Sequence, residues 1–77
     1  MRDMNDLLAV ANAYREEHIL GNGQFAATRA ARKAYRMRHP RATEADIDLH
    51  VSRLIAEAAE EYGPWLYGRD AADDDGE

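Results

Sequence analysis

The sequence contains no cysteine, a single serine, only two prolines and no long apolar run. Without cysteine the chain has no disulfide, no thiolate ligand for a metal ion and no thiol nucleophile. No apolar stretch approaches the ~20 residues that a membrane-spanning helix needs, and no signal-peptide pattern follows Met1. These absences predict a soluble, cytoplasmic protein that does not bind a membrane.

Large apolar side chains are also few for a chain of 77 residues. Alanine accounts for 15 residues; it favours helix more than any other residue but brings little apolar area to a core. A chain of this length forms one domain and buries roughly 60% of the surface that its unfolded form exposes. The composition predicts a helical domain of low stability, and a homodimer or a second protein would supply the missing burial.

Apolar residues recur at helical spacing in three segments, at about residues 3–20, 24–38 and 44–62. Glycine and asparagine at 21–23 end the first segment, because both accept the left-handed conformation that closes a helix. Pro40 ends the second segment, and Thr43 is placed to cap the third. The predicted fold class is all-α, a small three-helix bundle.

A short aromatic sequence follows the third segment. Gly63 and Pro64 stop the helix, and the large side chains of 65–67 come directly after them. Three residues are too few for an element of their own, and we expect them to fold back over the core. Residues 68–77 contain five acids and nothing apolar larger than alanine, which is typical of a disordered tail. The prediction is one helical domain over 1–67 and a disordered acidic tail over 68–77.

Charge is segregated along the chain, which has a net charge of −5. The cations of residues 28–41, with no acid among them, lie on or just after the second predicted helix: Arg29, Arg32, Lys33, Arg36, Arg38 and Arg41. This basic stripe fits a phosphate backbone, an acidic protein surface, or a solvated face whose cations pair with acids of the third helix or of the tail. The net negative charge argues against nucleic acid as the main partner.

The sequence offers little for catalysis or metal binding. His18, His39 and His50 lack the spacing of a zinc-binding helix, and Ser52 stands alone without a triad pattern. A helix-turn-helix is disfavoured, because the third segment begins with Glu44 and further acids that would repel DNA. We expect no enzyme, no catalytic residue, no metal, no cofactor and no small-molecule substrate.

Three apolar residues are candidates for contact with a partner: Leu49, Trp65 and Tyr67. Leu49 falls opposite the apolar stripe of the third segment, and tryptophan and tyrosine are frequent in binding hot spots. The sequence therefore predicts a small non-enzymatic interaction protein, a regulator, adaptor or inhibitor that binds a larger protein. Accessory proteins of phages and mobile elements often have this organisation, which is an association only. The alternative is binding of a nucleic-acid backbone through the basic stripe.

Overall fold

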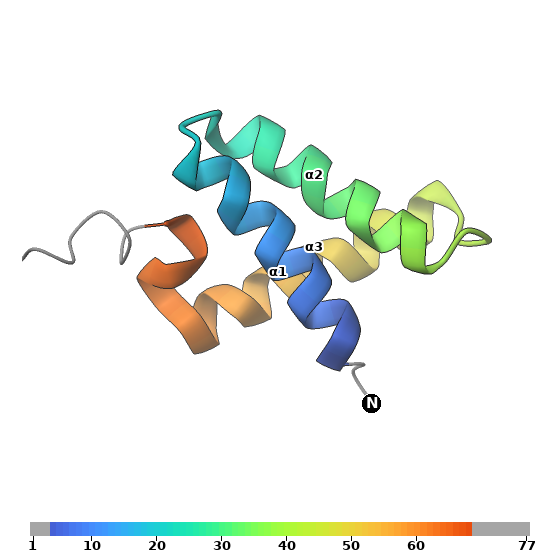
Figure 1. The fold of residues 1–77 in the computed structure, drawn as a ribbon. Helices are drawn as coiled ribbons and strands as arrows, with labels where there is room; N and C mark the ends of the chain where they lie inside the picture. Colours follow the sequence, from blue (N-terminus) through green and yellow to red (C-terminus); the bar gives the residue numbers. More distant parts are fainter. Residues whose placement is uncertain (1–3, 69–77) are drawn as a thin grey trace, which may run out of the picture.

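The computed structural model of the chain describes residues 4–68 (Figure 1). It contains three α-helices, α1 (Met4–Ile19), α2 (Gly23–Arg38) and α3 (Glu44–Tyr62), followed by a 3-10 turn, η1 (Gly63–Tyr67). The helix ends lie within one residue of the predicted ones, and residues 4–68 contain no strand. The predicted three-helix bundle is confirmed. Residues 69–77, which make up nearly all of the predicted tail, lie outside the described residues.

Helices α1 and α2 form an antiparallel hairpin with a tight turn between them (Figure 1). Gly21 has a φ of +80°, a conformation that a side chain would disfavour. The amides of Gly21 and Asn22 donate to the carbonyls of His18 and Glu17, at 3.1 and 3.0 Å. These bonds satisfy carbonyls at the end of α1 and turn the chain directly into α2.

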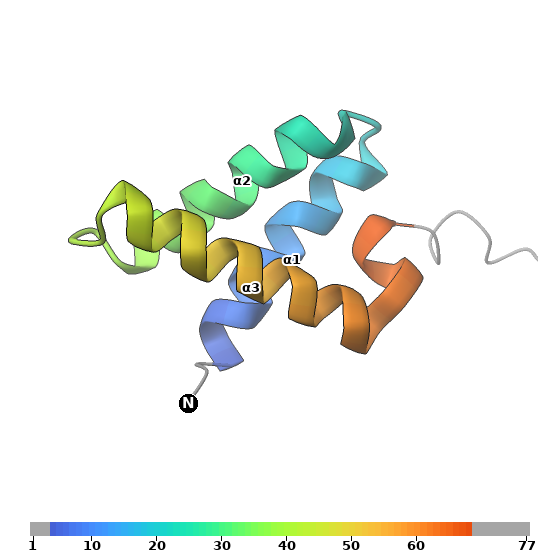
Figure 2. The ribbon, with the colours of Figure 1, turned by 180° about the vertical axis from the view of Figure 1, so that it is seen from behind.

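Helix α3 crosses one face of the hairpin and contacts both of its helices; it lies behind them in Figure 1 and in front of them in Figure 2. His39 adopts a non-helical conformation before Pro40, which ends α2 as predicted. The Thr43 hydroxyl accepts a hydrogen bond from the Asp46 amide at 3.1 Å, so the predicted N-cap of α3 is also present. The joint between the two helices therefore has a defined start and end.

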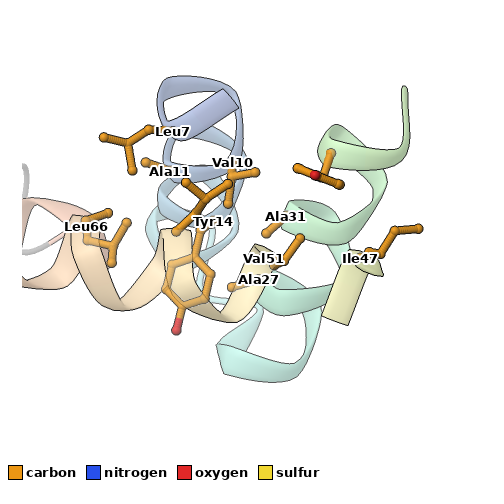
Figure 3. Packing of buried hydrophobic residues seen from close by; sticks show 12 residues of the cluster. Leu7, Val10, Ala11, Tyr14, Ala27, Ala31, Ile47, Val51 and Leu66 are labelled. Carbon is orange, nitrogen blue, oxygen red and sulfur yellow. The ribbon is translucent and has the colours of Figure 1, made fainter. Parts of the chain in front are cut away.

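The core lies where the three helices meet, and small side chains of α2 allow close packing there. Figure 3 shows side chains of α1, α2 and α3 gathered in this cluster. Its members are Leu7, Val10, Ala11, Tyr14, Ala27, Ala31, Tyr35, Ile47, Val51, Leu54, Ala58 and Leu66. In residues 4–68 no helix has the length and apolar character needed to span a bilayer.

Several side chains on the expected apolar faces are exposed. Met4, Leu8 and Ile19 are 51%, 41% and 47% exposed, and Met37 is 74% exposed. The apolar half of each helical wheel is wider than the arc that its neighbours cover. Spacing predicts which side is apolar, but the neighbouring helices decide how much of that side is buried.

Residues 65–67 belong to η1, so the expectation that they form no element of their own is wrong. Leu66 is fully buried. The Arg15 side chain donates from Nε to the Trp65 carbonyl at 3.0 Å, and its guanidinium lies 4.7 Å from the centre of the Trp65 ring. This turn therefore packs on α1, about fifty positions away along the chain.

Candidate docking surface on helix α2

Four exposed residues follow one another at four-residue spacing along the outer side of α2. Phe25 and Met37 stand at the two ends, 88% and 74% exposed, with Arg29 and Lys33 between them. Residues four apart lie on the same side of a helix, so these four form a continuous ridge opposite the buried alanines. We refer to Phe25, Arg29, Lys33 and Met37 as the α2 ridge.

The two cations of the α2 ridge have no ion-pair partner among the described residues. Together with neighbouring side chains they surround an open depression of about 590 Å³ that extends to Met37 and Pro40. The charges of Arg29 and Lys33 are therefore exposed beside apolar groups.

The next two cations of the basic stripe are already paired within the chain. Arg32 contacts Glu44 at 2.8 Å and also pairs with Asp48, and Arg36 contacts Glu44 at 3.2 Å. Both acids belong to the first turns of α3, so these pairs join α2 to α3. The prediction that the stripe could pair with acids of the third helix is confirmed for these two residues.

Arg38 has a different partner, at the start of α1. Its Nε donates to one oxygen of Asp6 at 2.5 Å, and the other oxygen lies 2.8 Å from Nε2 of His39. Burial alone raises the pKa of the Asp6 carboxyl, but the hydrogen bonds and charges of Arg38 and His39 lower it more. The pKa of Asp6 therefore lies below its usual value, and the carboxylate ties the first turn of α1 to the end of α2.

The last cation, Arg41, lies on the joint between α2 and α3 and has no ion pair with a described residue. It lines a depression of about 530 Å³ together with Tyr35, His39 and His50. The Tyr35 ring stacks on His39 with 4.5 Å between ring centres. Burial and the charges of Asp6 and Asp46 raise the pKa of the Tyr35 hydroxyl, which therefore stays protonated at neutral pH.

The three predicted apolar contacts belong to other elements than the α2 ridge. Leu49 is 48% exposed on α3, as its position on the wheel predicted. Trp65 is half-buried beneath Arg15, and Tyr67 packs edge-on against Tyr14 while remaining 40% exposed. Both aromatic residues thus contribute to the packing of η1 on α1.

Two residues of interest were missed from the sequence. Phe25 lies four positions before Arg29, and this spacing alone predicts an exposed aromatic side chain on the basic side of α2. Asp6 lies next to Leu7 and four positions before Val10, which places an acid on the apolar side of α1. Its partners come from more than thirty positions later, so no local pattern identifies them.

Within residues 4–68 no group of three or more histidine, aspartate or glutamate side chains is arranged to hold a metal ion. Comparisons with known proteins give no further guide to the site. No protein-family model matches this chain, and neither a curated protein nor a solved structure is significantly similar to it.

Proposed function

We propose that this chain is a small non-enzymatic interaction protein, a regulator, adaptor or inhibitor, that binds a larger protein through the α2 ridge. The observation that supports this most is the exposure of Phe25 and Met37 beside two cations that have no ion-pair partner among residues 4–68. Exposed aromatic residues and methionine are enriched at protein interfaces, where they fill pockets of the partner. The partner surface is acidic, with apolar pockets at either end of the contact.

The spacing of the α2 ridge specifies the geometry of that partner. Phe25 and Met37 are twelve residues apart, which corresponds to about 18 Å along a helix. Arg29 and Lys33 lie between them, so the carboxylates of the partner lie between its two apolar pockets. Paired charges of this kind mainly steer the encounter, whereas the buried apolar anchors slow dissociation.

Nucleic-acid backbone binding is the second candidate, supported by Arg29, Lys33 and Arg41, which form no ion pair with another described residue. It is less well supported, because Arg32, Arg36 and Arg38 already have carboxylate partners. A phosphate backbone also offers nothing apolar for Phe25 and Met37 to bury against. The net charge of −5 repels a polyanion over the rest of the molecule.

The test is affinity purification with the tagged full chain and three variants, followed by identification and direct titration of the retained proteins. We expect a partner retained by the wild type to be lost with Phe25→Asp and with Arg29→Glu/Lys33→Glu. The control Arg53→Glu places the same kind of change on α3, outside the α2 ridge, and should retain the partner. Retention by all four proteins would refute the α2 ridge as the docking surface.

A parallel titration with duplex DNA separates the two candidates. The protein-binding function predicts negligible DNA affinity at about 150 mM salt, where charges beyond roughly 8 Å are screened. Sub-micromolar DNA binding by the wild type, lost on Arg29→Glu/Lys33→Glu and falling steeply with salt, would instead support the nucleic-acid function.

A further inference from the structure

The described part of the chain ends at Gly68, which packs on the last residue of α1. Gly68 lies against the last residue of α1: a Cβ atom at Gly68 would lie 2.9 Å from Cγ1 and 3.3 Å from the backbone nitrogen of Ile19. Ile19 ends α1 and directly precedes the turn into α2, so Gly68 lies at the end of the hairpin that contains this turn. The last described residue therefore lies near the turn that leads into α2.

The sequence after Gly68 is negatively charged, whereas the α2 ridge is positively charged. Residues 69–77 contain five acids and one arginine, a net charge of −4. The two exposed cations of the α2 ridge, Arg29 and Lys33, have no carboxylate partner among residues 4–68. A carboxylate that comes within a few ångströms of either cation is attracted to it, because opposite charges closer than about 8 Å are only partly screened.

The length of this sequence is sufficient for contact. Nine residues of extended chain span up to about 30 Å. Arg29 and Lys33 lie six and ten residues after the start of α2, about 9 and 15 Å along its axis, and neighbouring helix axes are about 8–10 Å apart. Both cations are within reach of residues 69–77.

The other cations are less suitable targets. Arg53 lies on α3 beside Glu57 and Glu60, which line the same shallow surface. Arg41 lies past the far end of α2, about 27 Å along its axis from Gly23 and near the limit of reach. Arg32, Arg36 and Arg38 already contact carboxylates.

We propose that the acids of residues 70–77 bind Arg29 and Lys33 of the same chain and compete there with the acidic partner. The competition with a partner rests on the proposed function of the α2 ridge. The contact of residues 70–77 with Arg29 and Lys33 is independent of that function. A short tether holds the segment at a local concentration in the millimolar range, so weak ion pairs suffice to populate the contact. The protein then favours partners that also engage Phe25 and Met37 over those that offer negative charge alone.

The contact is tested by comparing amide NMR spectra of the full chain with those of a neutralised variant. The variant carries Asp70→Asn, Asp73→Asn, Asp74→Asn, Asp75→Asn and Glu77→Gln. We expect amide shift differences centred on Arg29 and Lys33 that disappear in about 0.5 M salt, where screening is strong. In a protein that also carries Arg29→Gln/Lys33→Gln, neutralising the same acids should change no amide shift in α2. In a protein that carries Arg53→Gln instead, neutralisation should produce the same shift differences as in the wild type.

Identical α2 amides in the two proteins would overturn the proposal, as would differences centred on Arg53. Differences that grow with protein concentration would also overturn it, because they would place the segment on a second copy. These spectra need no partner, so their outcome is independent of whether the α2 ridge captures one.

The competition is tested with a synthetic peptide rich in glutamate and leucine as the probe. We expect the neutralised variant to bind this peptide about three- to tenfold more tightly than the wild type, since two exposed ion pairs no longer have to be displaced. Equal affinity for the two proteins would overturn the competition.

Discussion

A single buried carboxylate links the ends of two helices in this molecule. Asp6 is 7% exposed, and each of its carboxylate oxygens has a hydrogen-bond partner, Arg38 on one and His39 on the other. A buried carboxylate without partners would be costly, and a paired one is stabilising only while it remains ionised. The stability of the hairpin therefore depends on the protonation state of Asp6.

This dependence gives a prediction about pH. Because the folded-state pKa of Asp6 lies below its usual value of 3.8, its contribution is present above that value and is lost as pH falls through the folded pKa. We expect Asp6→Asn to cost about 1–2 kcal/mol at neutral pH, since a neutral amide replaces a charged acceptor. Urea unfolding followed by circular dichroism at pH 7 and below pH 4 measures both effects. The variant should lose less stability on acidification than the wild type, and an equal loss would contradict the assignment.

At the scale of one element, the start of α3 depends on a local cap. The Thr43 hydroxyl binds the Asp46 amide, and Glu44 and Asp46 place two acids in the first turn, where the helix dipole favours them. Thr43→Ala removes the cap, and we expect a loss of about 0.5–2 kcal/mol in the free energy of unfolding. Thr28→Ala, within α2, is the control. Thermal unfolding compares the two, and equal stability of Thr43→Ala and the wild type would argue against the cap.

For the whole molecule, the arrangement of charge decides which cations are available to a partner. Glu44 and Asp48 neutralise Arg32 and Arg36 and leave Arg29 and Lys33 exposed. The acids of α3 thus limit the affinity of α2 for polyanions.

Removing these acids should convert the outer side of α2 into a stronger phosphate-binding surface. We expect Glu44→Gln/Asp48→Asn to bind duplex DNA more tightly than the wild type, with a log–log salt slope steeper by up to about 2. Glu16→Gln/Glu60→Gln makes the same change in net charge elsewhere and should leave the slope unchanged. Fluorescence anisotropy across a salt series measures the slopes. Equal slopes for the two double variants would show that the ion pairs with α3 do not prevent Arg32 and Arg36 from binding phosphate.

The sequence predicts the helices well and the site only in part. Helix ends were predictable because turn glycines, Pro40 and Thr43 act on their immediate neighbours. Whether Met37 is covered depends on where another helix lies, and neither spacing nor composition contains that information. The partners of Asp6 could not be predicted either, because Arg38 contacts Asp6 only when α1 and α2 pack as a hairpin.

The packing of η1 on α1 has a consequence for the order of folding. The contacts of Asp6 across the open end of the hairpin span 32 and 33 positions, and those nearer its turn span fewer, whereas Arg15 and Trp65 are fifty positions apart. Short loops close faster and at lower entropic cost than long ones. We therefore expect the hairpin to form early and Leu66 to enter the core late. A nascent chain lacking its last described residues would then hold an assembled hairpin over an incomplete core.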